Sequence, residues 1–335
     1  MRTAVISIFA LFALWAGFWV IGSFAQKSNT EDWFEAQRED GWIAEYRDLN
    51  VTGFPNRFDT VITGLNLADP RGGWAWEADE FKLLALSYNP NHLIAVWPQA
   101  QMIRTPDHRY NLSHERLRAS AVFARGGDYR LKRSSLEGSK VEVQINQNET
   151  IKLETLALAT RQGEGSAHDI AGDLTNITLS PERLGTIASS GLLPETIAKL
   201  TLRASPSFDA ALDQPNFSSG SVNMTALKLD TFDLTWGVIK LRATGAVTLD
   251  NQGFPTGDLS IRAEHWEKLL EVAVSIGAVQ PELTGAIEGA LGLISRLSSN
   301  PNELDITLTF EGGQTYIGFI PLGPAPRLWQ PRRGL

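Results

Sequence analysis

The sequence predicts an α+β fold that is mainly antiparallel β: a curved, open β-sheet with a groove-like apolar face and a few packing helices, preceded by an N-terminal transmembrane helix. Three observations carry this prediction. The chain starts with a long uncharged apolar run, most segments after residue 50 alternate apolar and polar residues, and helical spacing returns in few places. Strict alternation is typical of a strand that is buried on one face and solvated on the other.

The apolar run extends from Thr3 to Ala25 without a charged residue, which is long enough for a helix to cross the hydrocarbon core of a membrane. Arg2 precedes it, and positive charge before a span favours a cytoplasmic N-terminus. Trp15 and Trp19 match the aromatic anchors of membrane interfaces. We therefore expect an uncleaved signal anchor over residues 1–27. The alternative is a signal peptide that is cleaved after Ala25.

Alternating segments make up most of the remaining chain, and turn signals rich in Gly and Asn separate them. Because several of these segments are apolar on one face only, we expect an antiparallel sheet covered on one side. The expected strands are residues 59–67, 80–88, 140–146, 150–160, 173–179, 198–204, 222–236, 239–250, 258–263, 303–310 and 314–320.

Helical spacing is expected over residues 28–50, with a cap at Asn29 or Thr30 and a buried stripe that contains Trp33, Phe34, Gln37 and Trp42. Three further helices are expected later in the chain. They cover residues 180–200, 264–279 and 281–300, and a proline occupies the first helical position of the first and the last of them.

The tripeptide Gly-Phe-Pro occurs twice, at residues 53–55 and 253–255, and each copy precedes an alternating segment. Glycine permits a sharp turn, and proline pushes the residue before it into an extended conformation. The tripeptide therefore delivers the chain into a strand. Two copies leave open whether the exported domain, residues 28–335, consists of two related halves with a break near 180–205, or whether the repetition is a coincidence.

Composition excludes several classes of function. The 335 residues, 43% of them hydrophobic, are enough for one large β domain or two smaller ones. The net charge of -8, without a basic stripe, argues against nucleic-acid binding. The absence of cysteine excludes disulfides, thiolate metal sites and cysteine nucleophiles.

Three stretches resemble bacterial envelope proteins. WGVIKLRATGAVTLDNQGFPTGDLSIRAEHWEKLLEVAVSIGAV (residues 236–279) resembles a strand–turn–strand–helix segment of proteins related to the AsmA group, and LTFEGGQTYIGFIPLGPAPRL (308–328) resembles their last hairpin. TGFPNRFDTVITGLNL (52–67), with WAWEADEFKLLALSYNPNHLIAVWP (74–98) after it, resembles the family called domain of unknown function 2125. The resemblance covers most of residues 40–328.

The resemblance implies an N-terminal membrane segment and a β-rich exported region, and it brings no catalytic residues. Together with the apolar N-terminal run, it leads us to expect a single-pass protein of the inner (cytoplasmic) membrane, with the bulk of the chain in the periplasm. AsmA-like relatives are linked to envelope integrity and to lipid movement along apolar β grooves, so the resemblance implies a role of that kind.

The segment GEGSAHD brings Ser166, His168 and Asp169 together in sequence, as in a nucleophilic triad. In an extended chain Ser166 and His168 share one face while Asp169 points to the other. Glu164 also occupies a position that the Gly-x-Ser-x-Gly motif reserves for glycine. We therefore expect a polar hairpin loop here and no catalytic residue.

Metal and cofactor motifs are missing from the sequence. The histidines lack a compact ligand spacing. A metal site at His108 and His114, beside Asp107 and Glu115, is the alternative to a solvated loop that leads into a helix. Asp230 and Asp233 are expected on a solvated strand face. The clustered aromatic residues Trp74, Trp76 and Trp97 fill the core or line an apolar groove.

These observations favour a non-enzymatic envelope protein that binds or guides lipid acyl chains or supports envelope assembly, with membrane lipids as its partners and with no cofactor, metal or nucleic acid. The alternatives are a scaffold that binds another envelope protein and a serine hydrolase acting through Ser166. Burial of hydrocarbon stabilises lipid binding by roughly 25 cal/mol per Å². The expected groove residues are Leu84, Leu86, Val143, Ile145, Leu153, Leu229, Leu241, Val247, Ile306 and Leu308.

Overall fold

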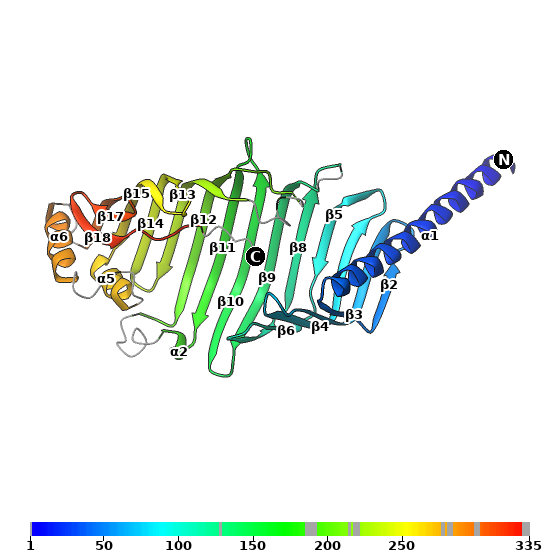
Figure 1. Cartoon of the computed structure of the whole chain (residues 1–335), viewed down its shortest axis with the longest axis horizontal. Coiled ribbons are helices and arrows are strands. Elements are labelled where there is room, and N and C mark those ends of the chain that lie inside the picture. The colour runs from blue at the N-terminus through cyan, green and yellow to red at the C-terminus, as the bar shows by residue number, and fades with distance from the viewer. Residues whose placement is uncertain are drawn as a thin grey trace. The chain divides into compact units, whose positions relative to one another are not determined.

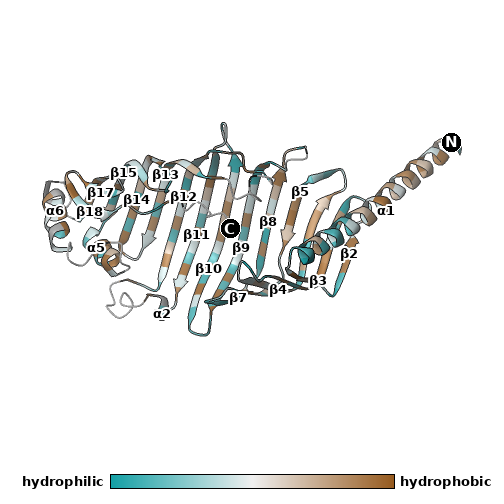
Figure 2. Cartoon of the chain, viewed as in Figure 1, coloured by the Kyte–Doolittle hydropathy of each residue, from teal (hydrophilic) through white to brown (hydrophobic). Residues whose placement is uncertain are grey.

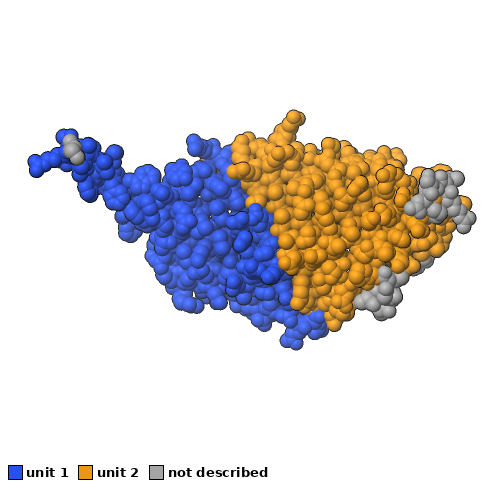
Figure 3. Space-filling model, turned by 180° about the vertical axis from the view of Figure 1, so that it is seen from behind, with its two compact units in different colours: residues 1–125, 136–148 blue, residues 126–135, 149–335 orange. Residues whose placement is uncertain are grey.

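The structure is a computed structural model, and it describes residues 2–126, 129–184, 193–213, 216, 222–275, 279, 284–297 and 302–329. Most of the described chain forms antiparallel strands, accompanied by a few helices (Figure 1). The prediction of a mainly antiparallel β fold behind one long apolar helix is therefore confirmed. The chain divides into two compact units (Figure 3): unit 1 contains residues 1–125 and 136–148, and unit 2 contains residues 126–135 and 149–335.

Unit 1 contains the N-terminal helix and a sheet in which β3 lies between β2 and β4 and also pairs with β1. Residues 136–145 of β9 belong to this unit. Its elements are α1 (Arg2–Glu39), β1 (Ile43–Glu45), β2 (Asp48–Thr52), β3 (Arg57–Asp69), β4 (Trp74–Leu86), β5 (Asn89–Val96), β6 (Ala100–Arg104), β7 (Arg109–Ser113), β8 (Arg116–Phe123) and β9 (Leu131–Ile145).

A break crosses the sheet of unit 1. Strands β5 and β6 pair with successive parts of β4, and residues 97–99 separate them. Strands β8 and β7 continue this arrangement as partners of β5 and β6, and residues 114–115 separate them. The two interruptions are joined by hydrogen bonds from His114 N to Gln99 O (3.0 Å) and from Trp97 N to Leu117 O (3.2 Å). Pro98 cannot donate a ladder hydrogen bond, which accounts for the break at this position.

The helix α1 is part of the core of unit 1. Phe34 is 1% exposed and belongs to a buried cluster with Ala44, Leu49, Ile62, Leu65, Leu67 and Ala78. The expected separate helix over residues 28–50 is wrong at both ends, because α1 runs without interruption from Arg2 to Glu39 and strands follow it. Thr30 lies inside α1 and donates its hydroxyl to Gln26 O at 2.8 Å, so it does not cap a helix. Of the expected buried stripe, Phe34 is confirmed, whereas Trp33 is 45% exposed.

Unit 2 is an antiparallel meander in which each strand pairs with the next one along the chain, from β10 to β18. Its elements are β10 (Glu149–Gln162), β11 (His168–Leu179), α2 (Pro181–Leu184), β12 (Thr196–Phe208), β13 (Met224–Trp236), β14 (Ile239–Leu249), β15 (Pro255–Glu264), α5 (Trp266–Ser275), α6 (Thr284–Leu297), β16 (Glu303–Glu311), β17 (Gln314–Ile317) and β18 (Ile320–Pro324).

The helices α5 and α6 confirm the helical pair expected near the C-terminus. They bury Trp266, Leu270, Ile287 and Leu291 against the sheet residues Ala263 and Leu304. The helix expected over residues 180–200 is wrong at its C-terminal end, because β12 begins at Thr196 and pairs with both β11 and β13. Residues 185–192 of that prediction lie outside the described residues.

Both Gly-Phe-Pro segments form turns that lead into strands, as expected, and each contacts a distant part of the chain. The first joins β2 to β3, and Phe54 contacts the ring of Trp19 at 5.4 Å in α1. The second joins β14 to β15, where Arg327 lies 4.8 Å from the ring of Phe254 and Leu328 N donates to Gly253 O at 2.9 Å. The expected break near residues 180–205 falls inside unit 2, and a relation between two halves stays a prediction.

Candidate functional site

The sheet of unit 2 has two chemically different faces, because its strands alternate polar and apolar residues. Figure 2 shows this alternation as teal and brown segments along the strands. One face carries a series of ion pairs between neighbouring strands: Arg161–Asp169 (2.9 Å), Arg203–Asp173 (2.7 Å), Arg242–Asp233 (2.7 Å) and Arg262–Asp305 (2.6 Å). Such exposed pairs contribute little stability each, and they mark a hydrated surface, which we call the polar face.

On the polar face, hydrogen bonds lower the pKa of two carboxyl groups, those of Asp169 and Asp173. The hydrogen bond from Arg203 holds the pKa of Asp173 below its ordinary value. Hydrogen bonds from Arg161 and then Ser205 do the same for the pKa of Asp169. Asp233 lies on this face, and Asp230 is ion-paired with Lys228 at 2.7 Å, so the predicted solvated strand positions are confirmed.

The opposite face is apolar, and the strand register shows how its side chains line up. Leu156, Leu174, Leu200 and Leu234 are successive cross-strand partners, and so are Leu158, Gly172, Leu202 and Phe232. A Cβ added at Gly172 would lie 3.2 Å from the Leu158 side chain, so the leucine already covers the glycine. We define the apolar face as Leu156, Leu158, Ile170, Leu174, Leu200, Leu202, Leu229, Phe232, Leu234 and Ile261.

Two parts of this side of the sheet are covered by other elements of unit 2. The helices α5 and α6 pack over Leu241, Ala263 and Leu304. Ala325, in the segment after β18, packs with Val247 and Phe310. Most residues of the apolar face lie on β10–β13, beside these covered parts, and they belong to none of the buried clusters of the described chain. They are partly exposed, and Leu158 is 39% exposed.

Small residues lie among the large ones on this side of the sheet. Ala204 is the partner of Ile170, Ala243 is the partner of Phe232, and Gly245 is the partner of Leu229. Because these positions carry little or no side chain, the neighbouring leucine and phenylalanine side chains protrude further from the sheet than they do. An alkyl chain on such an uneven surface can contact both the small residues and the sides of the protruding side chains.

The groove residues expected from the sequence fall into separate groups. Leu229 is on the apolar face. Leu241 and Ile306 pack under α5 and α6, and Val247 and Leu308 pack in the cluster with Ala325. The rest of the list is distributed over β10 and unit 1: Leu153, Leu84, Leu86, Val143 and Ile145.

The leucines of the apolar face other than Leu229 were not among the groove residues expected from the sequence. The signal was present, because Leu156 and Leu158 alternate with small residues in β10, and Leu200 and Leu202 alternate with Lys and Thr in β12. The alternation marks the apolar side of each strand, but it does not show which part of that side other elements cover.

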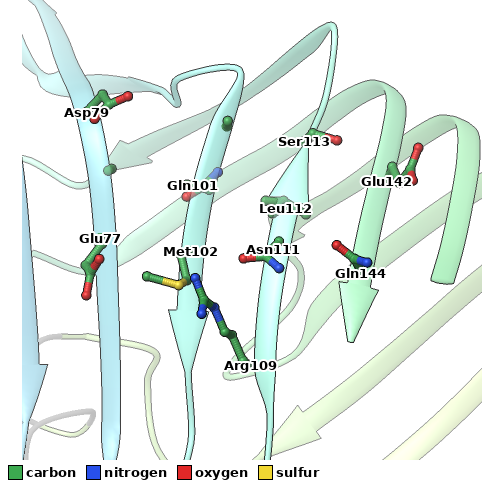
Figure 4. Close-up of a pocket in the computed structure, with 12 residues that line it drawn as sticks. Glu77, Asp79, Gln101, Met102, Arg109, Asn111, Leu112, Ser113, Glu142 and Gln144 are labelled. Atoms are coloured by element: carbon green, nitrogen blue, oxygen red, sulfur yellow. The ribbon is translucent and has the colours of Figure 1, made fainter. Parts of the chain in front are cut away.

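A polar pocket of about 370 Å³ lies in unit 1, among β4, β6, β7 and β9 (Figure 4). Glu77, Asp79 and Glu142 line it together with Arg109 and Gln101. Glu77 is ion-paired with Arg104. Carboxylate and amide groups at the wall make this pocket unsuitable for an acyl chain.

His114 is buried at the break between β7 and β8. It follows Ser113, one of the residues that line the pocket. Burial lowers its pKa, and the backbone carbonyl of Pro98 opposes this effect. The expected solvated loop leading into a helix is therefore wrong, because the segment forms two strands. In the described residues no group of three or more His, Asp or Glu side chains is placed to hold a metal ion.

The side chains of the GEGSAHD segment are directed to separate partners. The hydroxyl of Ser166 donates to the carbonyl oxygen of Phe208. His168 is 3% exposed and lies 3.4 Å from the Thr160 hydroxyl. Asp169 is on the polar face, as the alternation predicted. Ser166, His168 and Asp169 thus form the end of a hairpin, with each polar group engaged elsewhere.

The clustered aromatic residues support the core interpretation of their role. Trp74 and Trp76 pack against the buried cluster of unit 1, and the indole of Trp76 donates to Gln101 Oε1 at 2.7 Å. Trp97 contacts the ring of Phe81 at 5.7 Å.

Comparisons with known proteins add a family. A family model described as an uncharacterised protein conserved in bacteria, domain of unknown function 2125, matches residues 19–326. No curated protein and no solved structure matches the chain. By length and composition α1 is apolar enough to cross a membrane, a property that anchors and N-terminal signal sequences share.

Proposed function

This chain belongs to the bacterial protein family called domain of unknown function 2125, and we propose that it is a non-enzymatic cell-envelope protein that binds acyl chains of membrane lipids on the apolar face of unit 2. In this proposal α1 anchors the protein in the inner membrane, and the β-rich bulk of the chain lies in the periplasm. The expected relation to AsmA-like proteins belongs to the same proposal.

One observation carries the proposal. A set of large apolar side chains lies on one side of a sheet and is partly exposed, beside parts of the same side that other elements cover. A contiguous exposed apolar surface of this kind is uncommon on soluble proteins and marks a surface for an apolar partner. Each methylene group buried there contributes about 0.8 kcal/mol. A dozen of them contribute on the order of 10 kcal/mol before the cost of immobilising the chain.

The proposal is tested with a phospholipid that carries a photoreactive diazirine at the end of its acyl chain. The full-length protein is reconstituted in vesicles that contain this lipid, illuminated, digested and mapped by mass spectrometry. We expect adducts on α1 and, separately, on peptides of β10–β13. The adducts on α1 are an internal control, because they report insertion and not binding to the sheet.

The matched variants are Phe232→Asp and Thr231→Asp. Phe232 and Thr231 are neighbours on opposite faces of β13. Phe232→Asp places a charge on the apolar face and is expected to remove the adducts on β10–β13, whereas Thr231→Asp retains them. Adducts on α1 alone in the unaltered protein would refute lipid binding by unit 2.

A further inference from the structure

We propose that the turn between β2 and β3 enters the outer half of the membrane beside α1. The sheet of unit 1 then contacts the bilayer through this turn in addition to its connection to α1. We define the hairpin tip as residues 53–58. This inference needs α1 to lie in a membrane, but it does not depend on acyl-chain binding by unit 2.

The hairpin tip lies directly against the apolar part of α1. The ring of Phe54 contacts the rings of Phe12 (6.1 Å) and Trp19 (5.4 Å). Phe58 stacks on Trp19 at 6.1 Å and lies against Gly22, where an added Cβ would approach its ring to 2.4 Å. The contact therefore extends along α1 from Phe12 to Gly22.

The position of this contact along α1 determines its depth. An α-helix rises about 1.5 Å per residue, and a membrane span needs about 20 residues. A span that starts at Thr3 therefore ends close to Gly22. Trp15 lies roughly 18 Å from Thr3 along the axis, inside a hydrocarbon layer about 30 Å thick. A hairpin that touches Phe12, Trp15 and Trp19 thus lies beside the middle and the second half of the span, below the membrane surface.

Several backbone groups of the hairpin tip are hydrogen-bonded, which suits this environment. The indole N–H of Trp15 donates to Pro55 O at 2.9 Å, and that of Trp19 donates to Arg57 O at 2.7 Å. Pro55 has no N–H group, and Arg57 N donates to Gly53 O at 2.9 Å. Unsatisfied backbone groups are costly in lipid. Two tryptophans of a membrane helix here hydrogen-bond carbonyl groups of a loop.

The side chains around the hairpin tip fit a lipid interface. Phe54 is 47% exposed. Tyr88 is 65% exposed and lies in the turn between β4 and β5, which is at the same end of the strands as the hairpin tip. Aromatic side chains are enriched where membrane and water meet. The guanidinium of Arg57 pairs with the buried carboxylate of Asp59 at 2.6 Å, so the charge of this side chain is offset within unit 1.

Site-directed spin labelling tests the inference directly. Because the chain has no cysteine, one introduced cysteine gives one labelled position. The label is placed at Phe54→Cys and, as a second tip position, at Asn56→Cys. Ile8→Cys in α1 is the membrane reference. The aqueous control is Asp107→Cys. Asp107 lies in the exposed turn between β6 and β7, at the end of the strands opposite to the hairpin tip. The full-length protein is studied in vesicles of phosphatidylcholine and phosphatidylglycerol.

The measurement is the accessibility of each label to oxygen, which concentrates in lipid, relative to a water-soluble nickel complex. We expect the ratio at residues 54 and 56 to lie close to that of residue 8 and at least tenfold above that of residue 107. A ratio at both tip positions equal to that of residue 107, with residue 8 in lipid, would overturn the inference. A water-like ratio at residue 8 would overturn it too, because α1 would then lie outside the membrane.

Discussion

The indole nitrogen of Trp19 lies 2.7 Å from the carbonyl oxygen of Arg57 and donates a hydrogen bond to it. This bond joins the apolar N-terminal helix α1 to the hairpin formed by β2 and β3 in unit 1. Further along the same helix, Phe34 is buried in the core of unit 1. The helix is therefore a structural component of unit 1, and its removal would leave both the hairpin and the core incomplete.

The first prediction follows from this continuity: α1 is retained in the mature protein. Cleavage after Ala25 would remove the Trp19–Arg57 hydrogen bond and expose Phe58, whose ring lies against Gly22. The intact mass of the protein purified from membranes is expected to include α1. A mass that corresponds to a chain starting at Gln26 would contradict this prediction.

The second prediction concerns Phe34 and its neighbour Trp33. Phe34→Ala removes a fully buried ring and is expected to lower the free energy of unfolding by about 3–5 kcal/mol. Trp33 is 45% exposed, so Trp33→Ala is expected to cost much less. Chemical denaturation of both variants measures the difference. Equal losses would show that α1 does not pack on the sheet as described.

The third prediction is a loss of stability below neutral pH. Burial lowers the pKa of His168, against the opposing charge of Asp169, and burial also lowers the pKa of His114. The unfolded chain therefore binds more protons than the folded one as the pH falls below the ordinary histidine value of 6.5, so stability rises with pH in that window. Thermal unfolding between pH 8 and pH 5 should show this loss.

The control for the third prediction is the exposed residue His108. His168→Gln is expected to flatten the pH dependence, whereas His108→Gln should leave it unchanged. The carboxyl groups of Asp169 and Asp173 do not account for a loss near pH 6, because their pKa values lie below the ordinary 3.8 and their contribution is lost only in more acidic solution. A flat profile from pH 8 to 5 in the unaltered protein would contradict the burial of these histidines.

The fourth prediction concerns the C-terminal segment at Gly253. A Cβ at Gly253 would lie 1.7 Å from the backbone oxygen of Trp329, and the residue has a φ of +83°. Gly253→Ala is therefore expected to displace residues 325–329 and to make them sensitive to protease. Gly313 has a similar φ of +74° with open space around it, so Gly313→Ala is the control for backbone strain alone. Equal protease sensitivity of the two variants would contradict the packing of this segment.

The sequence predicted the elements whose signals are local. Alternation located β10 and β14 because each strand has one apolar side, and helical spacing located α5 and α6. The continuation of α1 through Thr30 was not predictable in this way. A threonine before acidic residues is a good helix cap in isolation, and only the burial of Phe34 against strands that follow it favours the longer helix.

The sequence predicted that the sheet has an apolar side, but it did not predict which residues of that side remain uncovered. Leu241 and Leu234 are cross-strand partners with the same local pattern, yet α5 and α6 cover the first and not the second. His114 is a similar case. It is buried where the interruption at residues 114–115 lies beside the interruption at residues 97–99, and these two segments meet only in the folded sheet. Coverage and burial depend on contacts between distant segments, which alternation does not record.

The most direct measurement of the central claim is photo-crosslinking in living cells from two adjacent positions of β12. A photoreactive amino acid replaces Leu202 on the apolar face or Arg203 on the polar face. These residues differ in the face of the sheet on which they lie, and α1 is unchanged in both proteins. We predict that the probe at residue 202 captures lipid and that the probe at residue 203 does not. Equal lipid capture from both positions, or none from residue 202, would contradict acyl-chain binding by this sheet.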